Sequence, residues 1–398
     1  MANVKLSARA RAVKTSPTLA LDARTKDLQA KGDDIVSFAV GEPDFDTPQH
    51  VKDAAAEAIA SGFTKYTATN GIPELKEAIV SKLSRENGLL YEPSQVLVSV
   101  GAKHCLYNAV MALCDVKDEV LIPSPFWVSY PEMVVLAGAV PVAVSPDQGF
   151  KVSARQLAGR LTARTKGIIL NSPSNPTGAV YTRSELEDLA QFVLDHDLWV
   201  IADEIYEHLV YDGYEHVSLA SLSPEIKERT ITVNGVSKAF AMTGWRIGYA
   251  AGPSDVIKAM GKVQIHTTSN PTSISQKAAV AALTGPMDTV WSMREEFDRR
   301  RRYMTERLHT MAGFSCQLPP GAFYVFTDVR DVLGKSYRGQ NIDNDDQLAE
   351  LILTEAHLAV VPGSGFGMPG HLRFSYATSQ SRIKEGLDRL ERWLKTLE

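Results

Sequence analysis

Cysteine is scarce in this chain, and the three cysteines that it has lie far apart. Cys105, Cys114 and Cys316 are odd in number, and their spacing is not that of a metal site. Disulfides accumulate in small secreted proteins and are rare in reducing compartments. The sequence therefore predicts a protein of a reducing compartment, without a disulfide framework and without a bound metal.

The chain also lacks a long apolar run and an excess of positive charge. Its longest apolar region, residues 133–144, is too short to span a bilayer and contains Pro141. The N-terminus has basic residues but no apolar block of the kind that a secretory signal needs. A formal net charge of −5 argues against nucleic acid as a partner. We expect a cytoplasmic protein with neither a membrane nor a nucleic-acid partner.

What the chain does contain is typical of a globular enzyme. It has 44% hydrophobic and 22% charged residues over 398 positions, which is enough for two domains with a large core. Apolar, strand-like runs separated mostly by helical patterns predict an α/β domain. These runs cover residues 96–100, 119–122, 140–144, 167–171, 199–203, 230–234 and 248–251.

A different pattern begins with a long helical segment near Val290. This segment contains four consecutive arginines, residues 299–302, which we interpret as a solvated helix face. The strand-like runs and the final helix that follow predict a smaller α+β domain, which the N-terminal segment joins. The predicted division is an N-terminal segment of residues 1–47, a large domain of residues 48–290 and a small domain of residues 291–398.

Lys238 is the most informative residue of the chain. It lies among small and apolar neighbours, eight residues before Arg246. Apolar surroundings disfavour the ammonium form, so a free amine that can form a Schiff base is available near neutral pH. Arg246 stays charged and offers a planar fork of donors that suits a phosphate. Together they indicate pyridoxal phosphate, with its aldehyde at Lys238 and its phosphate near Arg246.

Two polar residues near strand ends fit the same cofactor. Asp203 ends an apolar run, and in parallel-sheet proteins ligands bind beyond the carboxyl ends of the strands. An ionised carboxylate there favours a protonated pyridine ring, which can then act as an electron sink. Tyr206 lies three residues further on and would reach the phenolic oxygen of the ring. Asn175, in a turn-rich segment after the preceding strand, would bind the same oxygen.

Two further segments predict a phosphate site and a stacking partner. Gly101, Ala102 and Lys103 open a predicted helix, and helix N-termini bind anions. Trp127 lies just past the next strand and would stack on a flat ring. Taken singly, each of these signals is also explained by an ordinary turn, helix start, loop lysine or core aromatic. Their combination favours a cofactor site.

With these motifs in place, the chain resembles a fold-type I, pyridoxal-phosphate-dependent class I aminotransferase, most similar to the bacterial aspartate aminotransferase branch called Ib. The resemblance implies an α/β fold with a mixed, mostly parallel seven-stranded sheet in the large, cofactor-binding domain and a smaller α+β domain. It runs over nearly the whole chain through motifs in the expected order, at residues 41–48, 65–66, 71–75, 175–178, 203–206, 237–249 and 372–376.

The resemblance implies a role for each candidate residue. Lys238 would hold the cofactor and move a proton between the substrate Cα and the cofactor, while Asp203 would pair with the ring nitrogen. Tyr66 is expected to come across the interface of a homodimer. One departure concerns the phosphate, because many members have a hydroxyl where this chain has Gly235. The remaining cofactor contacts would be Tyr206 and Asn175 at the ring oxygen, Trp127 on the ring face, and Gly101, Ala102, Lys103, Ser237 and Arg246 around the phosphate.

For the substrate, the resemblance implies a carboxylate clamp. Arg373 would hold the α-carboxylate as a fork, with the backbone of Gly41 nearby and with Trp127 and Asn175 beside it. Since Arg373 lies in the predicted small domain, binding would bridge two domains, and closure would exclude water. Lys14 matches the lysine near the N-terminus that reads a distal carboxylate in the Ib branch, although it is also explained as a solvated lysine.

The predicted function is transfer of an amino group from L-aspartate or L-glutamate to a 2-oxo acid such as 2-oxoglutarate, by a ping-pong mechanism, with prephenate as a further acceptor. Aromatic- and alanine-type aminotransferases are alternatives. A C–S lyase of the same fold is another, because it would share Lys238, Asp203 and Arg373. A ligand sensor without activity would carry a fused DNA-binding domain, for which the sequence gives no sign. His266 and Tyr324 either line the pocket or pack in the core.

Overall fold

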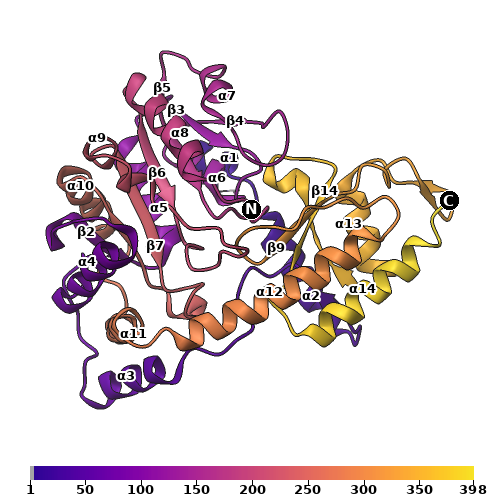
Figure 1. Cartoon of the computed structure of the whole chain (residues 1–398), viewed down its shortest axis with the longest axis horizontal. Coiled ribbons are helices and arrows are strands. Elements are labelled where there is room, and N and C mark those ends of the chain that lie inside the picture. The colour runs from indigo at the N-terminus through magenta and orange to yellow at the C-terminus, as the bar shows by residue number, and fades with distance from the viewer. Residues whose placement is uncertain (1–3) are drawn as a thin grey trace.

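The computed structural model describes residues 4–398, and a seven-stranded sheet forms its larger part (Figure 1). The strand order is β2-β8-β7-β6-β5-β3-β4, and all neighbours are parallel except the two pairs that β8 makes. The predicted mixed, mostly parallel sheet is therefore confirmed, and each apolar run forms one strand. The strands are β2 (Val96–Ser99), β3 (Glu119–Pro123), β4 (Val140–Val144), β5 (Thr165–Asn171), β6 (Trp199–Asp203), β7 (Thr230–Gly235) and β8 (Gly248–Ala251).

Helices cover both faces of this sheet because its central strands are apolar on both faces. Along β6, Ile201 packs into a core with α5, α6 and α10, whereas Val200 and Ala202 pack into a core with α8 on the other face. The helices of this part are α3 (Gln49–Ala60), α4 (Pro73–Asn87), α5 (Ala102–Leu113), α6 (Ser129–Leu136), α7 (Ala154–Ala158), α8 (Arg183–Asp195), α9 (Pro224–Lys227), α10 (Ser254–Ile265) and α11 (Ser273–Thr284).

The smaller part is built on a three-stranded antiparallel sheet of order β13-β14-β9. The long helix α12 (Asp288–His309) leads into it from beneath the large sheet, as Figure 1 shows in orange. The strand-like runs predicted after Val290 are therefore strands here. The other elements are β9 (Tyr324–Asp328), β10 (Ser336–Tyr337), β11 (Gln340–Asn341), α13 (Asp345–Glu355), β13 (Val361–Pro362), β14 (His371–Ser375) and α14 (Gln380–Leu394).

The N-terminal segment pairs with the smaller part. After α1 (Ala8–Ala12) and α2 (Pro17–Ala30), the short strand β1 (Val36–Ser37) runs parallel to β12 (Leu358–Ala359). The chain then crosses to the large sheet through residues 38–48, which we call the strap. The domain boundaries at residues 47/48 and 290/291 remain a prediction.

The four consecutive arginines of α12 are not a solvated face, so that interpretation was wrong for two of them. Arg300 is 5% exposed and Arg301 0% exposed, whereas Arg299 and Arg302 lie at the surface. Successive residues of an α-helix point about 100° apart, so four in a row surround the helix. Two of them must therefore face the core, where carboxylates pair with them.

Two other features bear on the compositional predictions. Cys105, Cys114 and Cys316 are free thiols. Within residues 4–398, no helix combines the length and the apolar character needed to cross a membrane.

Candidate active site

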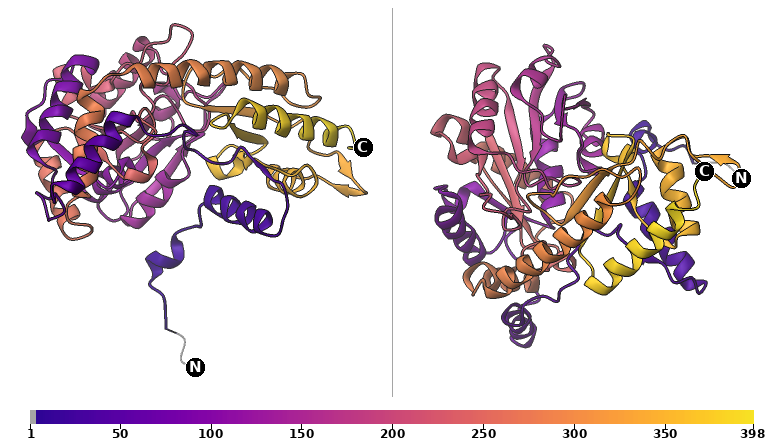
Figure 2. Two further views of the ribbon diagram at one scale, coloured as in Figure 1. Left: turned by 90° about the horizontal axis from the view of Figure 1, so that it is seen from below. Right: turned by 45° about the vertical axis from the view of Figure 1, so that its right-hand side comes forward.

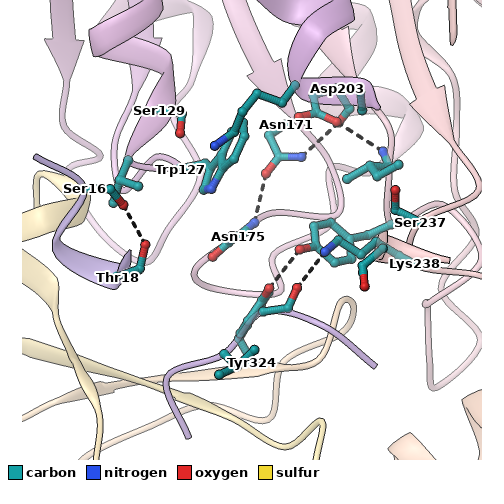
Figure 3. A pocket seen from close by; sticks show the side chains of 18 of the residues that line it. Ser16, Thr18, Trp127, Ser129, Asn171, Asn175, Asp203, Ser237, Lys238 and Tyr324 are labelled. Carbon is teal, nitrogen blue, oxygen red and sulfur yellow. Dashed lines mark hydrogen bonds between the residues drawn. The ribbon is translucent and has the colours of Figure 1, made fainter. Parts of the chain in front are cut away.

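A cavity of about 330 Å³ lies at the carboxyl ends of β5 and β6, beside the N-terminus of α5 and between the large sheet and the smaller part (Figure 3). In sheets of parallel strands, ligands bind in the crevice beyond the carboxyl ends of the strands. The predicted site residues that line it are Gly41, Ala102, Lys103, Trp127, Asn175, Asp203, Tyr206, Ser237, Lys238, Arg246 and Arg373. Gly101, Lys14 and Tyr66 are not among the lining residues.

Asp203 ends β6 and is held by a tyrosine that the sequence argument missed. The Tyr130 hydroxyl donates to Asp203 Oδ2 at 2.7 Å, and the backbone N–H of Ile205 donates to Oδ1 at 3.3 Å. Burial raises the pKa of Asp203 to about 6, and the hydrogen bond from Tyr130 limits the rise. Tyr130 also packs edge-on against Trp127, with ring centroids 5.4 Å apart. One phenol thus positions both the carboxylate and the indole.

Lys238 follows β7 and reaches across to the strap. Its Nζ donates to the backbone carbonyl of Gly41 at 2.6 Å. Burial lowers the pKa of the Lys238 amine to about 8; the carboxylate of Glu42 opposes this fall, and nearby arginines assist it. A substantial fraction of Lys238 is therefore unprotonated at mildly alkaline pH. This result fits the predicted nucleophilic amine.

Arg373 lies on β14, is 2% exposed and points from the smaller part into the cavity. Its Nη1 donates to Asn175 Oδ1 at 2.9 Å and its Nη2 to the carbonyl of Ala39 at 2.6 Å, while its buried Nε has no partner. No ion pair within residues 4–398 involves Arg373. A buried guanidinium without a counter-charge is costly, so the site is suited to an incoming carboxylate.

Asn175 is in turn held in place by Asn171 at the end of β5. The side chain of Asn171 accepts from the Asn175 backbone N–H at 2.9 Å and donates to the Asp203 carbonyl at 2.9 Å (Figure 3). Asn171 thereby fixes the spacing between two strand ends. Its presence in the turn-rich segment was visible in the sequence, but its bridging role was not.

Tyr206 lies against Tyr324, one of the two residues that the sequence placed either at the pocket or in the core. The two hydroxyls are 2.8 Å apart, and both side chains are buried. Tyr324 lines the cavity from β9 (Figure 3). His266, at the C-terminal end of α10, is exposed and does not line the cavity.

The N-terminus of α5 forms a positively charged end of the cavity. Gly101 is its N-cap with φ +83°, and a Cβ there would lie 2.5 Å from Arg246 Nη2, so only glycine permits this approach. The guanidinium of Arg246 therefore lies directly beside the helix N-terminus. Lys103 Nζ lies 4.8 Å from the centroid of the Trp127 ring, and its pKa is lowered by burial and by Arg246.

The other two predicted residues lie apart from the cavity. Tyr66 is 92% exposed. Lys14 is exposed, and its backbone N–H donates to Glu132 at 2.9 Å. In Figure 2 (left) the segment before α2 projects below the body of the molecule, while α1 and Lys14 contact α6. Ser16 and Thr18, which follow Lys14, do line the cavity and hydrogen-bond to each other at 2.8 Å.

This sheet order, with a lysine after β7 and an acid at the end of β6, is the architecture of the fold-type I class of pyridoxal-phosphate-dependent enzymes. The chain belongs to the family described as Aminotransferase class I and II, whose model matches residues 33–390.

Three relatives illustrate the similarity. The aspartate/prephenate aminotransferase of Cereibacter sphaeroides is 49% identical over 383 residues, covering 95% of this chain and 96% of the relative. The crystal structure of the aspartate aminotransferase from Rhizobium meliloti superposes with a TM-score of 0.96 at 46% identity, covering 100% of both chains. The structure of the Thermus thermophilus aspartate aminotransferase with maleate gives 0.92 at 46% identity, covering 98% of this chain and 100% of that one.

Proposed function

We propose that this chain is an aspartate aminotransferase that uses pyridoxal phosphate bound to Lys238. It would move the amino group of L-aspartate or L-glutamate to a 2-oxo acid such as 2-oxoglutarate in two half-reactions, with prephenate as a further acceptor. The observation that carries this proposal is that an amine of lowered pKa, a buried carboxylate and an unpaired buried guanidinium line one cavity. The names of the relatives support aspartate as the donor.

The residues present fit the cofactor. Asp203 offers its carboxylate to the ring nitrogen, and Trp127 offers a flat face to the ring. Arg246 and the N-terminus of α5 offer donors to a phosphate. When bound, pyridoxal phosphate supplies an electron sink for the bond that breaks at the substrate Cα.

The protein's own residues would then supply binding, orientation and proton transfer. Arg373 would exchange its hydrogen bond to Asn175 for the α-carboxylate of the substrate, which would provide the missing counter-charge. Lys238, whose pKa burial lowers to about 8, would accept the proton from the substrate Cα and pass it to the cofactor. Tyr130 would keep Asp203 oriented and ionised by its hydrogen bond.

The distal carboxylate of the substrate requires a second positive group. Maleate, present in the Thermus thermophilus structure, is a dicarboxylate. Lys14 is the residue predicted to bind the distal carboxylate, but Lys103, like the proposed Schiff-base lysine Lys238, lines the cavity. Substitution of Lys14 or Lys103 by alanine separates the two. A variant that loses activity with dicarboxylates but keeps it with alanine and phenylalanine identifies the lysine that binds the distal carboxylate. An equal loss with all donors would instead assign that lysine to cofactor binding.

The proposal is tested by loading the protein with pyridoxal phosphate and adding single amino acids. Aspartate and glutamate should convert the visible absorbance to that of the pyridoxamine form, and borohydride should fix the coenzyme to the peptide that contains Lys238. Aspartate with 2-oxoglutarate should yield oxaloacetate and glutamate. Release of pyruvate and ammonia from cysteine conjugates, without amino transfer, would contradict the proposal and favour the lyase. Fixation to another lysine would contradict it as well.

We also propose that the enzyme works in the cytoplasm as a homodimer in which Tyr66 completes the site of the partner. The position of Tyr66 supports this, because its side chain is 92% exposed and does not line the cavity of its own chain, so a partner chain can reach it.

A further inference from the structure

We propose that Tyr324 is a positioning residue for Tyr206: its hydroxyl holds the Tyr206 hydroxyl in place and commits the Tyr206 proton to the ring oxygen of the cofactor. This inference rests on the proposed function. Tyr324 is the first residue of β9 in the smaller part and is 0% exposed, whereas Tyr206 follows β6 of the large sheet. Their hydroxyls are 2.8 Å apart. The contact therefore joins the two parts at the cavity wall.

The direction of this hydrogen bond follows from the number of protons. Each phenol has a single proton to donate. Within residues 4–398, each of these two hydroxyls makes a hydrogen bond only to the other. If Tyr206 is to donate to a ring oxygen, its own oxygen must accept from Tyr324. Linked hydrogen bonds strengthen one another, so this arrangement makes Tyr206 a better donor.

The surroundings of Tyr324 allow little other placement. Its ring lies under the guanidinium of Arg373, whose central carbon is 4.5 Å from the ring centroid. On the other side its hydroxyl lies against the strap, where a Cβ on Gly41 would come within 2.6 Å of it. The same Gly41 accepts the hydrogen bond from Lys238. The Tyr324 side chain thus contacts Tyr206, which would bind the ring oxygen, and Arg373, which would bind the substrate carboxylate. Its hydroxyl also lies next to Gly41, where the absence of a side chain leaves space for it.

Tyr324→Phe removes this hydroxyl and keeps the ring under Arg373. A weaker donor at Tyr206 leaves more negative charge on the ring oxygen, which makes the nitrogen of Lys238 more basic. The visible absorbance of the loaded enzyme should therefore titrate at higher pH, by roughly 0.4 to 1.1 pH units for the loss of one ordinary hydrogen bond. In a Tyr206→Phe background the same change should produce no further shift, because the hydroxyl would have no partner to act on.

Tyr211→Phe is the matched control. Tyr211 is also a buried tyrosine, and its hydroxyl donates to the carbonyl of Ala322, two residues before Tyr324, at 2.7 Å. The Tyr211→Phe variant should have the same titration midpoint as the wild type. An equal shift with Tyr211→Phe, or additive shifts of Tyr324→Phe and Tyr206→Phe, would reduce Tyr324 to general packing and overturn the inference.

A second measurement uses the protein without cofactor. Gly41→Ala should lower the urea midpoint of unfolding in the wild type, and it should lower it less in the Tyr324→Phe background, where the obstructing hydroxyl is gone. An equal decrease of the urea midpoint in both backgrounds would show that the Tyr324 hydroxyl does not obstruct a side chain at position 41, and it would contradict the inference. If the wild type itself binds no pyridoxal phosphate at Lys238, the proposed function fails; if it binds and titrates normally but Tyr324→Phe behaves like the wild type, only this inference fails.

Discussion

Buried charged side chains in this protein are of two kinds, paired and unpaired. Lys82 is buried together with Glu207, and the buried Arg301 pairs with Asp212 and Asp298. Within residues 4–398, by contrast, neither Lys238 nor Arg373 forms an ion pair, and both line the cavity. Because an isolated buried charge costs free energy, these two groups identify the place where an anionic ligand would be stabilised.

Asp203 gives a prediction of pH dependence. Its pKa in the folded chain is raised from 3.8 to about 6, so the folded state binds the proton more tightly than the unfolded state. The stability linked to this proton is present below pH 3.8 and is lost as the pH rises through about 6. A shift of about 2 units corresponds to roughly 3 kcal/mol. As the pH rises from below 3.8 to above 6, the free energy of unfolding of the cofactor-free wild type should therefore fall by about 3 kcal/mol relative to that of Asp203→Asn.

The comparison between the two proteins cancels the many other carboxylates that titrate in the same range. Urea unfolding at several pH values provides the measurement. Asparagine keeps an oxygen that accepts from Tyr130, so the variant isolates the charge. A difference in stability that stays constant with pH would show that Asp203 titrates normally.

Lys82 gives a second prediction for a single residue. Although burial opposes it, the charge of Lys82 helps to hold the pKa of Glu207 well below its usual value. Lys82→Met should cost about 3 to 5 kcal/mol in urea unfolding, because it removes the buried lysine that pairs with the buried Glu207. Lys277→Met, which removes an exposed pair with Glu74, is the control and should cost less than about 1 kcal/mol.

The double variant Lys82→Met/Glu207→Gln tests the cause. It should recover a large part of the loss, because the buried carboxylate that Lys82 balances is then removed as well. No recovery would mean that Lys82 acts mainly through the packing of its methylene chain.

Among the elements, the strap of residues 38–48 lines the candidate site with Ala39, Val40 and Gly41. Gly41 accepts from Lys238, Glu42 accepts from Thr243 and Thr47 donates to the carbonyl of Ala241. Arg300 ties the strap to α12 through Asp44 at 2.7 Å. The buried arginine of α12 thus fixes the loop that contacts the lysine.

Arg300 and its neighbour Arg299 form a matched pair for a test. Arg300→Met should destabilise the protein by about 1 to 3 kcal/mol, because it leaves Asp44 and Glu296 without their shared, mostly buried partner. Arg299→Met removes an exposed pair with the same Glu296 and should cost less than about 1 kcal/mol. Urea unfolding measures both, and equal losses would mean that the contact with the strap contributes nothing.

The elements also show what the sequence could predict. Apolar runs between polar segments located every strand of the large sheet. An acid at the end of one strand and an amide in the turn after the neighbouring strand located Asp203 and Asn175, since the carboxyl ends of parallel strands lie at one edge. The hydroxyl partners were not predictable, because Tyr130 is 73 residues from Asp203 and Tyr324 is 118 residues from Tyr206. The arginine run was misread because charge alone does not reveal which side of a helix faces the core.

At the scale of the whole molecule, the candidate site is closed by contacts between the large sheet and the smaller part. Arg373 of β14 donates to Asn175 after β5, and Tyr324 of β9 meets Tyr206 after β6. The site is therefore complete only when both parts are docked, which fits the predicted closure on the substrate. Of the two predicted cofactor contacts that do not line the cavity, Gly101 lies against Arg246 at the N-terminus of α5, whereas Tyr66 is exposed and lies apart from the cavity.

The dimer prediction follows from that gap and can be tested by mixing two inactive variants. Lys238→Ala lacks the amine, and Tyr66→Ala lacks the side chain proposed to act in the partner's site. Refolding equal amounts together gives half mixed dimers, each with one complete site if Tyr66 crosses the interface, so roughly a quarter of the wild-type activity should return. If Tyr66 served its own chain, the mixed dimer would contain no complete site and the mixture would show only the average of the two variants. The activity of the mixture, compared with Lys238→Ala mixed with wild type as the dilution control, decides between the two arrangements.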